Sequence, residues 1–326
     1  MVEDRIVLST FQFSPASQEE LREAARMDVL CVTRDEDFIN NLKRAEIVCS
    51  YRMPENWHEL APHLRWLQYP GAGVDALLPT GLLAADSGVI VTTASGIHAT
   101  TISEYVFGSM LMFNWNWPEM VRLQESHVWA HSASWYHLGG RELEGQTLGV
   151  IGLGHIGRRV AVLGRAFGMR VLGMRHSAHQ GEEDRDVDQL FAPEQLHEML
   201  PLCDYIVLAV PLTSQTEGMI GEAELRLMKP NAYLVNVARG RVVDEVALTR
   251  ALQERRIAGA GLDVTEPEPL PPESPLYTMQ NVILTPHISG VSLYYDQRLT
   301  ALFANNLRRY RAGQPLLNRY DPARGY

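Results

Sequence analysis

Cysteine is scarce in this chain of 326 residues, which has three: Cys31, Cys49 and Cys203. Their number is odd, and they lie far apart in the sequence. They lack the close pairing that disulfide frameworks and cysteine metal sites show, so neither is expected here. We expect the three side chains to be reduced thiols in the protein core, and we expect no metal site.

Long apolar runs are also lacking. A membrane-spanning helix needs about 18 uninterrupted apolar residues, and no segment of this chain has them. The amino-terminal residues MVEDRIVLST carry acids where a secretion signal would have a basic run followed by a long apolar one. We therefore expect no membrane partner and a cytoplasmic location.

Lysine and arginine number 29 and are outnumbered by 39 aspartates and glutamates, which gives a formal net charge of -10. No dense lysine or arginine stretch is present that could neutralise a phosphate backbone, so nucleic acid is not an expected partner. A small anionic substrate stays possible, because local arginines and amides set the field inside a cleft.

The chain is longer than a single hydrophobic core usually supports, so we expect two domains. The apolar pattern predicts that both are of the α/β class. Short β-branched runs alternate with helical patterns over the first third, and a second alternation begins at TLGVIGLGHIG. The last helical pattern, SLYYDQRLTALFANNLRRYRAG, needs an apolar surface, and the first domain is the candidate. We predict a discontinuous substrate domain (1–99 and 291–326) and a doubly wound, dinucleotide-binding domain (100–290).

A glycine motif directly follows the apolar strand pattern TLGVI. Gly152, Gly154 and Gly157 form G-L-G-H-I-G, which includes His155 and Ile156, and a helical pattern continues from it. In a strand–turn–helix context such glycines permit a tight turn, close approach of a pyrophosphate and close helix packing. We predict a nicotinamide dinucleotide bound at the amino terminus of that helix.

The residue after the second strand of this domain is usually acidic and binds the adenosine ribose. This chain has Arg175 there, followed by His176 and Ser177. These side chains could donate to a 2′-phosphate, and no carboxylate at this position would repel it. We predict that NADP is preferred and that NAD is possible; a solvated arginine without discrimination is the alternative.

Several longer blocks carry a family resemblance over nearly the whole chain: GVIGLGHIGRRVA, VPLTSQTEGMI, MKPNAYLVNVARGRVVDEVAL, GAGLDVTEPEPLP and NVILTPHISG. The sequence resembles the D-isomer-specific 2-hydroxyacid dehydrogenases, particularly the glyoxylate and hydroxypyruvate reductase-like branch. The resemblance implies a Rossmann domain inserted into a flavodoxin-like substrate domain. It also implies hydride transfer between NAD(P)H and a small 2-oxo acid, the product being a D-2-hydroxy acid.

The family's catalytic set falls here on Arg239, Glu268 and His287. Reduction of a 2-oxo acid needs a proton at the carbonyl oxygen, and a histidine is suited to donate one near neutral pH. A carboxylate on the other imidazole nitrogen would set the tautomer and stabilise the imidazolium. An arginine would bind the substrate carboxylate and polarise the carbonyl, because its donors form a fixed fork.

The resemblance of these sequence blocks to the family implies further site residues. In YPGAGVD, Ala72 and Gly73 resemble the amides that hold the substrate carboxylate, alongside Arg239 and His287. Thr101 and Asp263 resemble positions near the nicotinamide, with Asp263 able to accept from its carboxamide. The other cofactor residues implied are Val210, Pro211, Thr216, Val237 and Ala238.

The segment after Trp115 is rich in tryptophan and histidine. In the relatives this region forms a dimer arm, so a homodimer is expected, with Trp135 reaching the neighbouring subunit's substrate site. Exposed aromatic side chains on an arm need a covering partner, although packing within one chain is the alternative. Arg52, which follows the strand EIVCSY, either points into the substrate cleft or lies on the surface.

Three alternative functions compete with this one. Formate dehydrogenases share the architecture but resemble a version with glutamine in place of Glu268, so the glutamate argues against formate, whereas phosphite oxidation is not strictly excluded. A nicotinamide-sensing binding protein of the same fold is the alternative from another class. Turnover of any 2-oxo acid would separate an enzyme from a binding protein.

Overall fold

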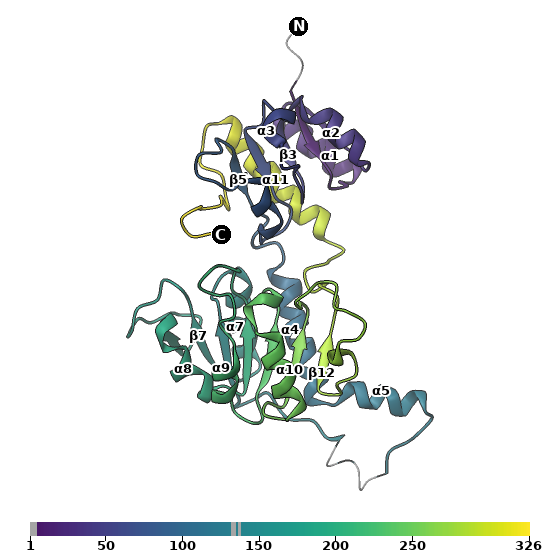
Figure 1. The fold of residues 1–326 in the computed structure, drawn as a ribbon, viewed down its shortest axis with the longest axis vertical. Helices are drawn as coiled ribbons and strands as arrows, with labels where there is room; N and C mark the ends of the chain where they lie inside the picture. The colour runs from purple at the N-terminus through teal and green to yellow at the C-terminus, as the bar shows by residue number, and fades with distance from the viewer. Residues whose placement is uncertain (1–4, 132–134, 136–137) are drawn as a thin grey trace. The chain divides into compact units, whose positions relative to one another are not determined.

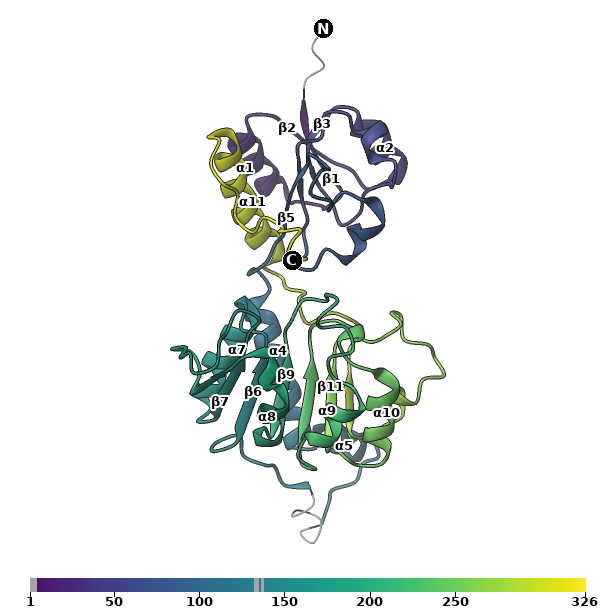
Figure 2. The ribbon, with the colours of Figure 1, turned by 60° about the vertical axis from the view of Figure 1, so that its left-hand side comes forward.

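The computed structural model describes residues 5–131, 135 and 138–326. The chain divides into two compact units, one made of residues 1–97 and 292–326 and the other of residues 98–291 (Figures 1 and 2). Each unit is a parallel β-sheet with helices. The predicted α/β fold class is therefore confirmed.

The first unit has a five-stranded sheet in the order β2-β1-β3-β4-β5, with every neighbouring pair parallel. This is the flavodoxin-like order, in which the chain reverses direction across the sheet between β1 and β3. The strands are β1 (Ile6–Ser9), β2 (Asp28–Cys31), β3 (Ala45–Cys49), β4 (Trp66–Gln68) and β5 (Ile90–Thr92). The helices are α1 (Pro15–Ala25), α2 (Asp35–Leu42), α3 (Trp57–Leu60), η1 (Asp75–Thr80) and α11 (Tyr295–Arg311).

Helices α1 and α11 pack together on one face of this sheet, although 269 residues separate Ala25 from the start of α11 at position 295 (Figure 2). Helix α1 begins where Ser14 accepts a hydrogen bond from the Ser17 amide, with Pro15 in the first turn, and such a cap satisfies an otherwise unpaired donor. Leu299, Phe303 and Leu307 share a buried cluster with residues of β1, β3 and α1. The last helix thus completes the core of the first unit.

The second unit has a seven-stranded parallel sheet in the order β12-β11-β10-β9-β6-β7-β8. Counted along the chain from β6, this is the Rossmann order 3-2-1-4-5-6 with a seventh strand added at the edge. The strands are β6 (Thr147–Ile151), β7 (Arg170–Met174), β8 (Gln189–Phe191), β9 (Tyr205–Leu208), β10 (Tyr233–Asn236), β11 (Gly259–Leu262) and β12 (Val282–Leu284). The chain direction reverses between β6 and β9, where such sheets bind ligands.

Apolar clusters cover both faces of the second sheet, as its continuous apolar strands require. The larger helices are α4 (Ala99–Asn114), α5 (Trp117–Glu125), α7 (His155–Ala166), α9 (Glu222–Leu227) and α10 (Glu245–Gln253). Shorter helical turns are α8 (Leu196–Met199), η2 (Pro193–Gln195), η3 (Leu200–Leu202), η4 (Gly240–Val242) and η5 (Pro275–Tyr277). Asp244 caps α10 by accepting from the Ala247 amide at 3.0 Å.

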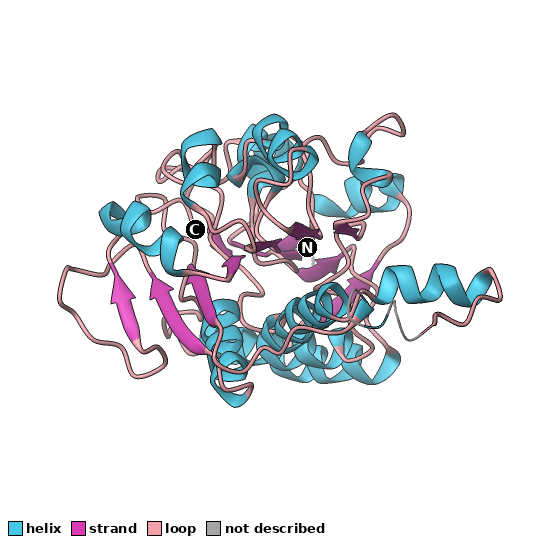
Figure 3. Cartoon of the chain, turned by 90° about the horizontal axis from the view of Figure 1, so that it is seen from below, coloured by secondary structure: helices cyan, strands magenta, loops and turns pink. Residues whose placement is uncertain are grey.

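Helix α5 projects from the rest of the second unit in two perpendicular views (Figures 1 and 3). None of its residues is buried. Within residues 5–131, 135 and 138–326, no helix has the length and apolar character needed to cross a membrane.

Candidate active site

The glycine motif forms the turn between β6 and α7. Gly152 has φ +102°, and a Cβ there would lie 2.6 Å from the Ala209 carbonyl oxygen, after the neighbouring strand β9. A Cβ on Gly157 would lie 1.9 Å from the carbonyl oxygen of Gly152. Both positions therefore exclude side chains, for reasons of backbone conformation and close packing.

Gly154, in contrast, has open space around its Cβ position and is exposed at the amino terminus of α7. His155 is also exposed, and Ile156 is half-buried. An open glycine before a helix of 12 residues, at the point where the chain direction reverses, offers backbone donors and room for a pyrophosphate. The local structure thus fits a dinucleotide cofactor.

The other predicted cofactor residues lie in the same unit, most of them after strands. Thr216 closes the turn after β9, donating to the Pro211 carbonyl at 2.6 Å and accepting from the Thr213 amide at 2.9 Å. Val210 is half-buried, and Val237 and Ala238 are buried directly after β10. Thr101 lies in the first turn of α4, where its hydroxyl donates to the His98 carbonyl.

Arg175, His176 and Ser177 follow β7. His176 and Ser177 are exposed, whereas the Arg175 guanidinium binds the carboxylate of Glu182. The prediction of donors available to a 2′-phosphate did not anticipate this partner. The run GEEDRD was visible in the sequence, but nothing in its pattern shows that the loop folds back onto Arg175.

His287 and Glu268, predicted to act together, are in contact. The Nδ1 atom of His287 lies 2.8 Å from Oε2 of Glu268, and both side chains are partly exposed, at 48% and 39%. His287 follows β12 and Glu268 follows β11, which are adjacent strands, so the parallel sheet brings both loops to one edge. Nδ1 is engaged by the carboxylate, which leaves Nε2 as the nitrogen available to a substrate.

Asp263 holds the His287 loop. This carboxylate is buried and accepts from the Thr285 hydroxyl at 2.6 Å and from the amides of Ile288 at 2.9 Å and Ser289 at 3.0 Å. The His287 amide also donates to the Asp263 carbonyl, at 2.8 Å. His287 has φ +54°, a conformation that costs a non-glycine residue energy and persists only where surrounding contacts enforce it.

This anchoring role was missed in the sequence, where Asp263 was matched only to a nicotinamide contact. Tyr105, on α4, extends the network by a 2.8 Å hydrogen bond between its hydroxyl and that of Thr285. Burial raises the pKa of Tyr105 to about 12, so its hydroxyl stays protonated. Because the partners come from α4, β11 and the β12 loop, no short motif could have revealed them.

We expect Asp263→Asn to lower both kcat and the melting temperature. The amide NH₂ would face a backbone donor in the His287 loop, and a lost or unsatisfied buried hydrogen bond costs about 1–3 kcal/mol. Steady-state kinetics and thermal unfolding would measure the two effects.

Asp204→Asn is the matched control, because Asp204 is also buried and accepts from Lys229 and the Thr147 amide, each at 2.9 Å. It lies directly before β9, at the amino-terminal ends of the strands, whereas Asp263 lies after β11 at their carboxyl ends. This control should lose stability but keep kcat. An unchanged kcat in Asp263→Asn would contradict the anchoring role.

Arg239 follows β10, the strand next to β11, so the predicted triad occupies the ends of three adjacent strands. One of its guanidinium nitrogens, Nη1, donates to the Ala238 carbonyl at 2.7 Å. The side chain is half-buried, and a guanidinium keeps its charge at any physiological pH. The site therefore combines a fixed cation with a histidine–carboxylate pair.

Ala72 and Gly73 belong to the first unit, in the loop after β4, with Ala72 exposed and Gly73 half-buried. The start of this loop is held by Tyr295, whose hydroxyl donates to the Pro70 carbonyl at 2.8 Å. The Tyr51 hydroxyl lies 2.8 Å from that of Tyr295. This tyrosine pair was not singled out in the sequence.

Arg52 is paired with Asp35 on the exterior of the first unit, which agrees with the surface alternative. Cys49 and Cys203 are buried, and burial raises the pKa of both thiols, that of Cys203 to about 12. Cys31 is only partly buried, so the expected core placement holds for two of the three. Trp135 is 60% exposed, and its indole donates to the Ala130 carbonyl at 3.3 Å.

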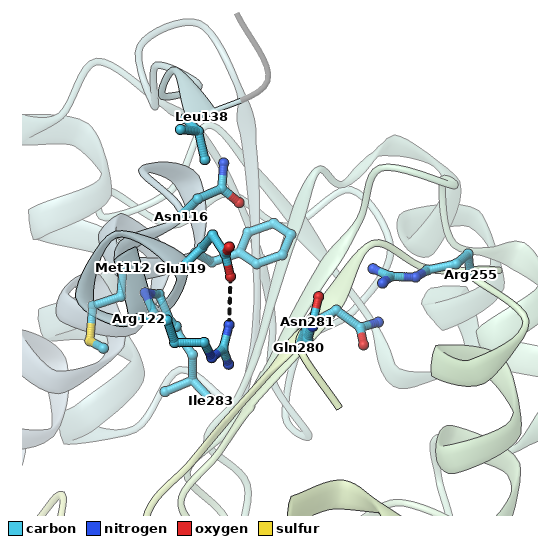
Figure 4. A pocket seen from close by; sticks show the side chains of 11 residues that line it. Met112, Asn116, Glu119, Arg122, Leu138, Arg255, Gln280, Asn281 and Ile283 are labelled. Carbon is cyan, nitrogen blue, oxygen red and sulfur yellow. Dashed lines mark hydrogen bonds and ion pairs between the residues drawn. The ribbon is translucent and has the colours of Figure 1, made fainter. Parts of the chain in front are cut away.

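A hollow of about 270 Å³ lies elsewhere in the second unit (Figure 4). It is lined by residues at the end of α4, on α5 and before β12, including Phe113, Arg122 and Asn281. The dashed line in Figure 4 marks the 3.0 Å ion pair of Glu119 with Arg122. This hollow is at the amino-terminal edge of β12, opposite the edge that carries His287, so it is not part of the candidate active site.

The chain is similar to several known proteins. A family model described as "D-isomer specific 2-hydroxyacid dehydrogenase, NAD binding domain" matches residues 107–289. A glyoxylate reductase of Thermococcus gammatolerans is 36% identical over 306 residues, covering 90% of this chain and 86% of the relative.

Two solved structures are similar over the whole chain. One is a D-isomer specific 2-hydroxyacid dehydrogenase of Xanthobacter autotrophicus in complex with NADPH and MES, at 30% identity and a TM-score of 0.83, covering 100% of both chains. The other is an NADPH-dependent glyoxylate/hydroxypyruvate reductase of Sinorhizobium meliloti in complex with NADP and sulfate. It has 25% identity and a TM-score of 0.81, covering 99% of this chain and 100% of that one.

Proposed function

Because the chain belongs to the D-isomer specific 2-hydroxyacid dehydrogenase family, we propose that it reduces glyoxylate and hydroxypyruvate at the site built on Arg239, Glu268 and His287. It is an oxidoreductase that moves a hydride between NAD(P)H and a small 2-oxo acid. The choice of these two acids rests on the reductases it resembles. The observation that carries the proposal is the 2.8 Å pair of His287 with Glu268 at the sheet edge that also carries Arg239.

His287 acts as the general acid in the direction of reduction. Its Nε2 donates a proton to the carbonyl oxygen of the 2-oxo acid while carbon 2 accepts the hydride, and in the reverse direction Nε2 takes that proton back. Glu268 binds Nδ1, so it holds the ring in one orientation and stabilises the imidazolium. When bound, the reduced nicotinamide supplies the hydride.

Arg239 binds the substrate carboxylate through its planar donors and polarises the neighbouring carbonyl. Developing negative charge on the carbonyl oxygen is stabilised most in the transition state, so this contact raises kcat as well as affinity. The part of Ala72 and Gly73 in holding the carboxylate, and a product of D configuration, stay predictions from resemblance.

We propose, as predicted from the sequence, that the unit of residues 98–291 binds the cofactor. The unit of residues 1–97 and 292–326 is then the substrate domain. The open Gly154 and the two sterically required glycines support the first assignment. The residues after β6, β7, β9 and β10 would hold the dinucleotide at one edge of the sheet.

The direct test is the absorbance of the reduced nicotinamide with glyoxylate, hydroxypyruvate, pyruvate, phenylpyruvate and 2-oxoisocaproate, each with NADPH and NADH. We expect turnover of glyoxylate and hydroxypyruvate. Turnover confined to the bulky 2-oxo acids would contradict the proposed substrates. Cofactor binding without turnover of any acid would favour the nicotinamide-sensing alternative.

NADP is the proposed preferred cofactor, and NAD the lesser one. Arg175 supports this, because it stands where a carboxylate would otherwise repel a 2′-phosphate. We expect Arg175→Ala to raise KM for NADPH about 10-fold to 100-fold, the equivalent of one charge-assisted hydrogen bond, while KM for NADH stays near that of the unaltered protein. Parallel kinetics with the two cofactors would measure this. An equal loss with NADH would contradict a role specific to the 2′-phosphate.

A homodimer is proposed through the α5 arm. Trp117 and Val121 on α5 are 50% and 51% exposed, and Trp129 beyond it is 89% exposed. Large apolar side chains exposed on and just after a projecting helix are typical of a surface that a partner covers. Light scattering should give a dimer mass, and Val121→Asp should yield a monomer, whereas the same change at Val246, which is 80% exposed on α10, should not. A monomeric unaltered protein would contradict the proposal.

A further inference from the structure

The loop between β7 and β8 folds back onto Arg175. Glu182 binds the guanidinium with one carboxylate oxygen, and its other oxygen accepts from the His179 amide at 3.1 Å. Asp184 approaches the same guanidinium, with its Oδ2 3.7 Å from Nη1. The carboxylate that the sequence lacks at position 175 is thus supplied by the loop a few residues later.

A second arginine belongs to the same cluster. Arg158, on α7, binds Asp184 through two nitrogens at 2.8 and 3.0 Å and also binds Asp186. The hydrogen bonds from Arg158 hold the pKa of Asp184 below its ordinary value, so this carboxylate stays ionised at neutral pH. Arg185 also pairs with Asp186, at 3.7 Å, so three guanidinium groups face three carboxylates. The positive charge of Arg175 is thus already compensated where a 2′-phosphate would arrive.

Asp184 and Glu182, the two carboxylates near Arg175, differ in how firmly they are held. The side chain of Asp184 is 7% exposed, and its Oδ1 also accepts from the Asp186 amide at 3.0 Å, so it is part of the loop's framework. The side chain of Glu182 is 36% exposed, and a guanidinium and one amide hold it. Glu182 is therefore the carboxylate that can be displaced.

The pairing of Arg175 is also incomplete. Its Nε atom is buried and has no hydrogen-bond partner among the residues that the structure describes. An unsatisfied buried donor is unfavourable, so the ion pair with Glu182 does not fully satisfy this side chain.

We propose that Glu182 is a specificity-determining residue that competes with the 2′-phosphate of NADP for Arg175 and thereby limits the preference for NADP over NAD. The inference rests on the proposed contact of Arg175 with that phosphate. Binding of NADP must release the Glu182 carboxylate, which then remains nearby as a repelling charge. NAD has no 2′-phosphate, so its binding leaves the ion pair intact.

The test uses calorimetric titration of the full-length protein with adenosine 2′,5′-bisphosphate and with ADP, which present the adenosine ribose with and without the 2′-phosphate. Glu182→Gln should tighten binding of the bisphosphate about fivefold to tenfold, because the competing charge is removed while the side-chain size is kept. ADP should bind unchanged. Binding of ADP also shows that each variant is folded.

Glu183→Gln is the matched control, since it removes the same charge at the next residue, whose side chain is exposed. It should change affinity for the bisphosphate less than about twofold, as expected for a solvent-screened charge. An equal gain from both variants would overturn the proposal, because it would reflect only the general field of the loop. Weaker ADP binding in Glu182→Gln would overturn it too, since Glu182 would then be binding the ribose.

A double-substitution cycle with Arg175→Ala separates the inference from its premise. If Glu182 acts through Arg175, Glu182→Gln should give no gain when Arg175 is absent. A gain that persists without Arg175 would overturn the competition. If Arg175→Ala leaves bisphosphate binding unchanged, the proposed NADP contact itself fails. If that contact holds but Glu182→Gln gives no gain, only the inference about Glu182 fails.

Discussion

Replacing His287 with glutamine should lower kcat for glyoxylate reduction by about 10²-fold to 10⁴-fold, the range that a positioned general acid contributes. Glutamine keeps a polar side chain of similar reach but cannot deliver a proton at neutral pH. Stopped-flow or steady-state absorbance of the nicotinamide would measure the loss. Binding of NADPH, followed by its fluorescence, should be nearly unchanged, because the proposed role of His287 is at the substrate oxygen.

The protein contains a close control for this substitution. His197 forms a similar histidine–glutamate pair, with its Nε2 2.7 Å from Glu224 Oε1, but on the surface of the same unit and away from the strand ends that carry the triad. His197→Gln should keep kcat. If both substitutions had equal small effects, His287 could not be the proton donor. Glu268→Gln should lower kcat by an intermediate factor. The imidazole remains, but no carboxylate then orients the ring or stabilises the imidazolium.

Replacing Arg239 with lysine should lower kcat/KM for glyoxylate by about 10²-fold to 10³-fold, comparable with removing one donor that stabilises transition-state charge. Lysine keeps the positive charge but replaces a rigid two-nitrogen fork with a single mobile ammonium group. The loss should appear in both KM and kcat, because the proposed role of Arg239 is to bind the carboxylate and also to polarise the carbonyl.

Arg241→Lys is the control for Arg239, two residues further on, where the guanidinium pairs with Glu217 at the surface. It should leave kcat/KM unchanged within about twofold, as expected for an exposed ion pair. Arg239→Gln should be worse than Arg239→Lys, since it removes the charge as well. A lysine variant as active as the unaltered protein would show that charge alone suffices and that the fork geometry is not needed.

The fold class and the core of the site could be predicted from the sequence because they depend on local constraints. Alternating apolar strand and helix patterns indicate parallel α/β sheets whatever the rest of the chain does. Gly152 and Gly157 are required by a positive φ and by contacts within the same turn. Arg239, Glu268 and His287 each come shortly after a predicted strand, and the carboxyl ends of parallel strands share one edge.

The partners of those residues could not be predicted in the same way. Asp263 was matched to a cofactor contact, yet three donors of the β12 loop surround its carboxylate. Arg175 was expected to present its donors to a phosphate, yet Glu182 binds it. Arg52 was predicted either to point into the cleft or to lie on the surface, and in the structure its guanidinium pairs with Asp35. In each case the answer depends on the path of a loop.

The order of the amino acids is enough to predict the strands and turns, the positions of the glycines and the residues that follow the strand ends at the candidate site. Which charges neutralise each other there depends on the folded chain. Backbone sterics and apolar periodicity act over a few residues, so they can be recognised in the order of amino acids. An ion pair such as that of Arg175 with Glu182 depends instead on the distance between two side chains in space, and that distance exists only after the loop has folded.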